Sequence, residues 1–141
     1  MKQCLSEPLS AANQDTIENH LSHTDWPNVT SVLPLDDGYQ FTLQIPVDLS
    51  FFSGHFPTAP ILPGVVQVHW AACFAERYLN LKGHFHQLRN LKFFSKIEPL
   101  AELHLLIQNT AKGFNFTYTS MQPEGLVCKH SAGQFEWIER E

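Results

Sequence analysis

The sequence contains few cysteines and no long apolar run. Its three cysteines, Cys4, Cys73 and Cys128, are an odd number without Cys-x-x-Cys spacing, so they indicate neither a disulfide framework nor a zinc site. We interpret them as reduced thiols. No stretch reaches the roughly 18 uninterrupted apolar residues of a membrane-spanning helix, and the N-terminal region has no apolar run of signal length. We therefore expect a soluble, cytoplasmic protein without a membrane span.

Charge is also scarce and unevenly placed. Charged residues make up 16% of the 141 residues and hydrophobic residues 43%, which favours one folded domain over residues 1–141 with apolar surface left for another subunit. The net charge of −5 argues against a nucleic-acid partner. No acid lies between Glu76 and Glu98, yet five of the nine basic residues do: Arg77, Lys82, Arg89, Lys92 and Lys96. This basic stretch is either a solvated face or a docking surface for an acidic partner.

Alternating residues and turns divide most of the chain into strands around one helix. The predicted strands cover residues 29–33, 39–45, 85–97, 103–110, 114–119 and 126–137. Residues 10–21 have the spacing of a short helix, and residues 53–64 form a loop stiffened by three prolines. Residues 65–79 are apolar nearly all round, which is typical of a buried helix. The order predicts an α+β fold in which one curved antiparallel sheet wraps around a long central helix.

The proline-rich loop and the start of this helix carry the residues suited to chemistry. His55 follows Gly54, which allows close approach of a ligand, and the prolines hold its position. The amides of Gly64 and Val65 would be unpaired donors at the positive end of the helix dipole. Such donors suit the oxygen of a polarised carbonyl. An imidazole, amide donors and the apolar wall of Phe56 are together what proton abstraction next to a thioester requires.

His69 lies on the predicted buried helix, where an unpaired polar group is costly. It is either a core histidine bonded to a carbonyl or a second reactive group. Cys73, one turn later, is either close to it or plain core. The remaining histidine pairs lack the third ligand of a metal site: His20 with His23, and His84 with His86. We expect no metal and no cofactor.

The run from Phe51 to His69 resembles the signature of the β-hydroxyacyl-acyl-carrier-protein dehydratases of fatty-acid synthesis, hotdog-fold enzymes of the FabA and FabZ type. The matching residues agree in spacing as well as type: Phe51-Phe52, Gly54-His55-Phe56-Pro57, Pro60-Ile61 and Pro63-Gly64-Val65-Val66. A looser similarity covers about residues 29–137, so that residues 1–28 form a divergent N-terminal segment. The run Pro-Gly-Val-Val-Gln-Val-His-Trp is most similar to the ApeI-like dehydratases of aryl-polyene clusters.

The resemblance implies reversible dehydration of a 3-hydroxyacyl thioester on acyl carrier protein to the trans-2-enoyl thioester. His55 corresponds to the catalytic base, and Gly64 to the amide that binds the thioester carbonyl, with Val65 beside it. The family has Glu or Asp fourteen residues after the base, where this chain has His69. His69 would help the 3-hydroxyl to leave, as imidazolium or through a water.

The resemblance also implies partners. The two histidines would come from different subunits of a homodimer, or of a higher oligomer of dimers, and the basic stretch would meet the acidic carrier protein. The acyl chain would occupy a tunnel lined by Phe56, Pro63, Phe93 and Phe94. Two alternatives stay open. A hotdog acyl thioesterase would hydrolyse the same kind of thioester, but it positions water with a helical acid that this chain lacks at position 69. The missing acid keeps open a catalytically silent acyl-binding or partner subunit.

Overall fold

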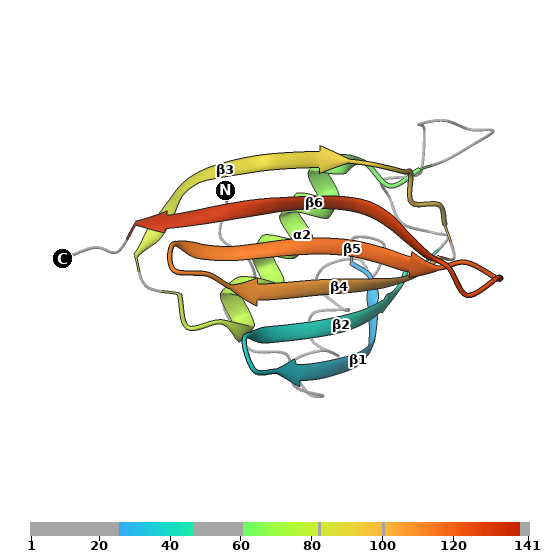
Figure 1. Cartoon of the computed structure of the whole chain (residues 1–141), viewed down its shortest axis with the longest axis horizontal. Helices are drawn as coiled ribbons and strands as arrows, with labels where there is room; N and C mark the ends of the chain where they lie inside the picture. Colours follow the sequence, from blue (N-terminus) through green and yellow to red (C-terminus); the bar gives the residue numbers. More distant parts are fainter. Residues whose placement is uncertain (1–25, 47–60, 82, 100, 139–141) are drawn as a thin grey trace.

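The protein forms one antiparallel sheet with a helix across it. The structure, a computed structural model, describes residues 26–46, 61–81, 83–99 and 101–138 (Figure 1). Within these ranges the strands are β1 Asn28–Leu35, β2 Gly38–Gln44, β3 His84–Phe93, β4 Glu102–Asn109, β5 Gly113–Met121 and β6 Val127–Ile138, and the helix is α2 Gly64–Tyr78. The sheet order is β1-β2-β4-β5-β6-β3. The predicted hotdog fold is confirmed.

Strict alternation builds the central strands. In β4, the inward positions Leu103, Leu105 and Ile107 are buried, and their neighbours along the strand are more exposed. The same period-two pattern runs through β5, where Phe114 and Tyr118 are buried. Side chains on alternate positions of a strand share one face, so one face of the sheet is apolar and covers α2, while the other carries amides, hydroxyls and charges.

Helix α2 is buried over most of its length, as its composition predicts. Phe74 packs against Phe41 of β2, with ring centroids 4.7 Å apart, and Tyr118 of β5 donates a hydrogen bond to the carbonyl of Gln67. These contacts define the face of α2 that meets the sheet. Residues four apart stack on one side of a helix, so Val65 and His69 occupy the opposite face, which the sheet does not cover.

The third predicted strand is too long. Residues 85–97 were expected to be extended, but β3 ends at Phe93. The backbone N–H groups of Phe94 and Ser95 both turn toward the carbonyl of His130, at 2.8 and 3.4 Å, which takes the chain out of the sheet. Two register shifts precede this point, and Asn90 adopts a positive φ of 54° at the second. Such bulges bend an edge strand and redirect its side chains.

Helix α2 begins one residue before the predicted start and ends at Tyr78, where Leu79 returns to an extended backbone. The helix predicted at residues 10–21 and the loop at residues 53–60 lie outside the described residues.

Candidate active site

The start of α2 presents two backbone donors. Pro63 is the N-cap, and its carbonyl accepts hydrogen bonds from the N–H groups of Val66 and Gln67 at 3.1 and 3.3 Å. Within the described ranges, no acceptor meets the N–H groups of Gly64 and Val65. Adjacent unpaired amides at a helix N-terminus carry partial positive charge and suit an oxygen that gains negative charge. The helix start can therefore polarise a carbonyl.

An aromatic ring lies directly beside these donors. A Cβ atom on Gly64 would come 2.6 Å from Cζ of Phe93, at the end of β3, so only glycine leaves room for the ring. Phe93 is 52% exposed and keeps an open apolar surface. The structure thus brings together Gly64 and Phe93, two of the residues that the sequence assigned to one site, from segments that are far apart in the chain.

The segment leading into α2 is held from two sides. The N–H of Leu62 donates to the carbonyl of Ile97 at 2.8 Å, and the carbonyl of Leu62 accepts from Nε2 of Gln67 at 3.1 Å. Oε1 of Gln67 accepts in turn from the hydroxyl of Ser131 at 2.7 Å. Sequence reasoning missed this network. The signal available was an amide in the otherwise apolar first turns of the helix and a serine at an inward position of β6.

His69 is half-buried on the helix face turned away from the sheet. Its ring centroid is 6.0 Å from that of Trp26, and its Nε2 is 3.6 Å from Sγ of Cys73 one turn later. The expectation of three reduced thiols is wrong for Cys73, which is disulfide-bonded, whereas Cys128 is a free thiol.

Two of the predicted site residues, His55 and Phe56, lie outside the described residues, as does Lys82. Phe94 is exposed, and Nζ of Lys129 lies 5.2 Å from the centre of its ring. The roles assigned to all these positions stay predictions.

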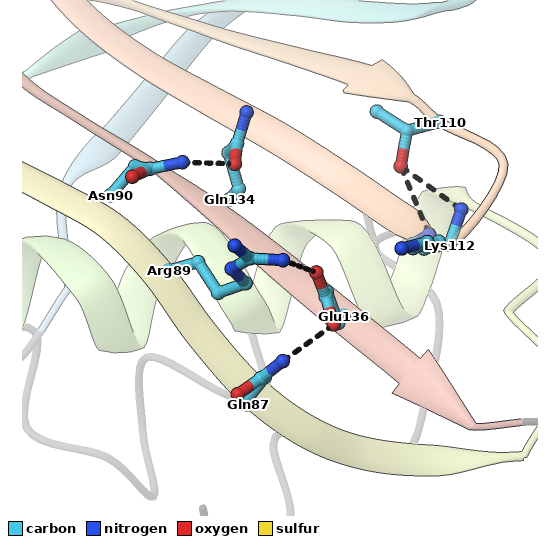
Figure 2. A network of polar contacts seen from close by, with 8 residues as sticks. Gln87, Arg89, Asn90, Thr110, Lys112, Gln134 and Glu136 are labelled. Atoms are coloured by element: carbon cyan, nitrogen blue, oxygen red, sulfur yellow. Dashed lines mark hydrogen bonds and ion pairs between the residues drawn. The ribbon is translucent and has the colours of Figure 1, made fainter.

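The described residues of the basic stretch differ in their surroundings. The guanidinium of Arg77 lies 6.0 Å from the ring of Trp26, and partial burial lowers its pKa from the ordinary value. Arg89 lies on the outer face of the sheet and pairs with Glu136 at 3.1 Å. Figure 2 shows that pair beside the bonds from Gln87 to Glu136 and from Asn90 to Gln134. Lys92 is exposed, and Lys96 lies 3.9 Å from Glu98.

A second polar cluster surrounds the buried His130 of β6. Nε2 of His130 is 2.7 Å from the hydroxyl of Ser120, and its Nδ1 is 3.0 Å from the hydroxyl of Ser95. Ser95 also donates to the carbonyl of Lys129 at 2.9 Å. The histidine therefore has partners on both ring nitrogens, which is how a structural histidine is satisfied in a core. The sequence analysis did not single out these residues.

In the part of the chain that the structure describes, no group of three or more His, Cys, Asp or Glu side chains is arranged to hold a metal ion. In the same ranges, no helix is long and apolar enough to cross a membrane.

A sheet curved around one helix, with unpaired amides at the helix start, defines a protein of the hotdog class. The sequence profile of the ApeI-like family, described as ApeI dehydratase, matches residues 34–131. The chain therefore belongs to the ApeI-like dehydratase family.

Individual relatives agree with this assignment. The 3-hydroxyacyl-acyl-carrier-protein dehydratase FabZ of Protochlamydia amoebophila is 30% identical over 144 aligned residues, covering 94% of this chain and 91% of the relative. The FabZ of Novosphingobium aromaticivorans is 28% identical, covering 69% of each chain. An uncharacterized thioester dehydrase of Halalkalibacterium halodurans is 35% identical, but that match spans only about half of each protein, 50% of this chain and 51% of the relative.

Solved structures show the same fold. The dehydratase heterocomplex ApeI:P from Xenorhabdus doucetiae contains a chain that superposes with a TM-score of 0.71 at 26% identity, covering 81% of this chain and 99% of that one. An uncharacterized protein from Erwinia carotovora superposes with a TM-score of 0.69 at 28% identity, covering 81% and 97%.

Proposed function

We propose that the protein catalyses reversible dehydration of a 3-hydroxyacyl thioester carried on acyl carrier protein, giving the trans-2-enoyl thioester. The observation that carries the proposal is the pair of unpaired amides at Gly64 and Val65, with the ring of Phe93 beside them. Relatives named as 3-hydroxyacyl-acyl-carrier-protein dehydratases support the substrate class. We place the reaction in fatty-acid-like or aryl-polyene biosynthesis.

The proposed mechanism divides the work among three groups. The amides of Gly64 and Val65 bind the thioester oxygen and stabilise the charge that develops there when the C2 proton leaves. His55 takes that proton, and His69 donates a proton to the 3-hydroxyl, directly or through a water. The C3–O bond then breaks, a C2–C3 double bond forms and water leaves. Proton transfer from His55 back to His69 restores the starting state.

We infer that the active protein is a dimer joined at β3. This strand lies at an edge of the sheet, so its outer backbone groups have no partner strand in the described chain. Exposed apolar side chains line it, including Phe85, Leu91 and Phe93. A long apolar edge strand normally pairs or is covered. The partner is a second copy of this chain, or a related hotdog subunit as in the ApeI:P heterocomplex. Size-exclusion chromatography with light scattering separates a monomer from these dimers.

We propose that acyl carrier protein docks on exposed basic residues near the end of β3. Lys92 and Lys96 are exposed cations, and the ion pair of Lys96 with Glu98 is long, at 3.9 Å, whereas Arg77 is packed against Trp26. Opposite charge on the carrier would speed association more than it would tighten binding. Charge reversal at Lys92 should raise KM for the carrier-bound substrate and leave turnover of a short pantetheine thioester unchanged.

We propose a cytoplasmic location. In fractionated cells the protein should be recovered with the cytosolic marker enzymes, and recovery with the membrane or exported fraction would contradict this location. The disulfide at Cys73 speaks against it, because disulfides are rare in the cytosol.

One assay separates dehydration from the two alternatives. The protein is incubated with 3-hydroxyacyl carrier protein, and the mass of the carrier is followed. Loss of one water supports dehydration, release of the carrier thiol supports a thioesterase, and no change supports a silent acyl-binding or partner subunit. The silent role is favoured over the thioesterase by His69, which replaces the family acid, and by the two-subunit ApeI:P complex. Wild-type turnover in His55→Ala would contradict the mechanism.

A further inference from the structure

Gln67 is a buried amide in the middle of the site, with only 3% of its surface exposed. Its Nε2 donates to the carbonyl of Leu62 and its Oε1 accepts from the hydroxyl of Ser131. Its main-chain carbonyl accepts from the hydroxyl of Tyr118 at 2.7 Å. Only this orientation of the amide gives the Leu62 carbonyl a donor, so Ser131 is the donor to Oε1. Strands β5 and β6 thus both hold Gln67, the first through its main-chain carbonyl and the second through its side chain.

The network acts on the two residues that precede the unpaired amides. Pro63 has no N–H, and no side chain caps the helix start. Leu62, just before it, is tied to Ile97 through its N–H and to Gln67 through its carbonyl. The plane of the peptide groups entering the helix is therefore set from inside the core. The Gly64 N–H belongs to the next peptide group, whose oxygen, the carbonyl of Pro63, accepts from the N–H groups of Val66 and Gln67 at 3.1 and 3.3 Å. Because a peptide group is planar and the ring of Pro63 fixes its φ, the anchored Leu62 carbonyl and these two bonds together set the direction of the Gly64 N–H.

We propose that Gln67, oriented by Ser131, is a positioning residue for thioester binding: it aims the Gly64 and Val65 amides at the thioester carbonyl. This inference rests on the proposed function, since it concerns the same site. Gln67 itself lies on the sheet side of α2 and contacts no substrate. Its contribution is preorganisation, because donors that are already aimed at the developing charge need no rearrangement during the reaction.

Packing alone does not account for the amide. A methionine fills a similar volume without polar atoms, and removing both partners of a buried hydrogen bond is often nearly neutral for stability. The double variant Gln67→Met, Ser131→Ala removes the amide and its donor together. It leaves only the Leu62 carbonyl without its side-chain donor, so it should remain folded, with a somewhat lower melting temperature, and lose the direction of the helix start. The matched control is Ser120→Ala, which removes an equally short bond, 2.7 Å to Nε2 of His130, from the strand next to β6.

The test measures carbonyl polarisation directly, so that it does not depend on turnover. Butyryl pantetheine labelled with ¹³C at the thioester carbonyl has no 3-hydroxyl and cannot be dehydrated. Isotope-edited difference infrared spectroscopy of this probe, bound to the wild-type protein, should show the carbonyl band shifted to lower frequency. The shift should persist in Ser120→Ala and should be largely lost in the double variant, with all spectra recorded well below the melting temperature of each protein.

Kinetics with 3-hydroxyacyl carrier protein should agree. The double variant should lose at least tenfold in kcat with little change in KM, whereas Ser120→Ala should match the wild-type protein. Gln67→Glu keeps the shape but places an acceptor against the Leu62 carbonyl, so its activity should recover relative to wild type as the pH falls and the carboxyl becomes protonated. A merely structural role would not produce this pH dependence.

The outcomes separate the two proposals. A wild-type infrared shift without any turnover would overturn the proposed dehydration and leave the role of Gln67 standing. Turnover with an unchanged shift and kcat in the double variant would overturn the role of Gln67 and leave dehydration standing. No shift in the wild-type protein would overturn the inference outright.

Discussion

Replacing Gly64 by alanine probes how tightly the helix start is fitted to Phe93. The new Cβ would lie 2.6 Å from Cζ and 2.7 Å from Cε1 of that ring. Carbon atoms in contact prefer about 3.5–4.0 Å, so either the ring or the helix start has to retreat by roughly 1 Å. The backbone itself accepts alanine, because Gly64 does not have a positive φ. Alanine should even favour the helix by up to about 1 kcal/mol.

The contact with Phe93 and the gain in helix propensity have opposite effects on the free energy of unfolding, but the gain in helix propensity does not offset the effect of the contact on activity. Overpacking costs typically about 1–3 kcal/mol, which the gain in helix propensity offsets in part, so the melting temperature should change by only a few degrees. A displacement of about 1 Å at the reacting centre can cost about 100-fold in rate, or about 2.7 kcal/mol in activation free energy. We therefore expect Gly64→Ala to lose most of its turnover while remaining folded.

A second substitution, at Phe93, tests whether the contact with this ring causes the loss of activity in Gly64→Ala. Phe93→Leu removes the ring atoms that the new methyl group would meet, so the double variant should recover most of the activity that Gly64→Ala loses. Single-turnover dehydration, followed by the mass of the carrier-bound acyl group, measures each variant beside its melting curve. Wild-type turnover in Gly64→Ala, or a double variant no faster than Gly64→Ala alone, would refute the reasoning.

Three further predictions concern pH and the second histidine. Tyr118→Phe should lower the free energy of unfolding by about 1 kcal/mol at neutral pH. Burial raises the pKa of Tyr118 well above its ordinary value, so above about pH 10 this tyrosine ionises in the unfolded wild-type protein and stability falls. In urea unfolding, the stability of the variant should therefore fall less steeply above about pH 10. The bond from Gln87, aided by Arg89, lowers the pKa of Glu136 from 4.5, so its stabilising effect is present above that pH and is lost as the pH falls below it. Glu136→Gln should accordingly flatten the acid unfolding curve, and parallel curves would contradict this. His69→Gln should lower kcat by about 100-fold or more and change its pH profile if His69 is an acid catalyst; an unchanged rate and profile would make it structural.

Local patterns predicted the strands that lie in the middle of the sheet. The predicted strands 103–110 and 114–119 agree with β4 and β5 to within one or two residues, because alternation and the turn between them are written in neighbouring residues. The end of β3 could not be predicted in this way. It is decided by the His130 carbonyl, which belongs to a strand about 35 residues further along the chain.

In the candidate site, too, some features follow from local patterns and others depend on residues that are distant in the sequence. Its helix start was recognisable, since Pro63-Gly64 before an apolar run is a local signal for unpaired first-turn amides. Gln67 was visible only as a polar residue in a buried helix, and nothing near it indicated its partners. His55, the residue on which the resemblance depends most, lies outside the described residues and keeps the role that the sequence gives it as a prediction.

By itself, the sequence determined the hairpins, the buried helix and the two amides at its start, because each depends on residues within a few positions of one another. Only the tertiary structure decided that Phe93 lies against Gly64, and that Tyr118 and Ser131 hold Gln67 from 51 and 64 residues away. Such contacts depend on how β5, β6 and α2 pack against one another, and packing depends on the shapes of the whole core rather than on any local pattern.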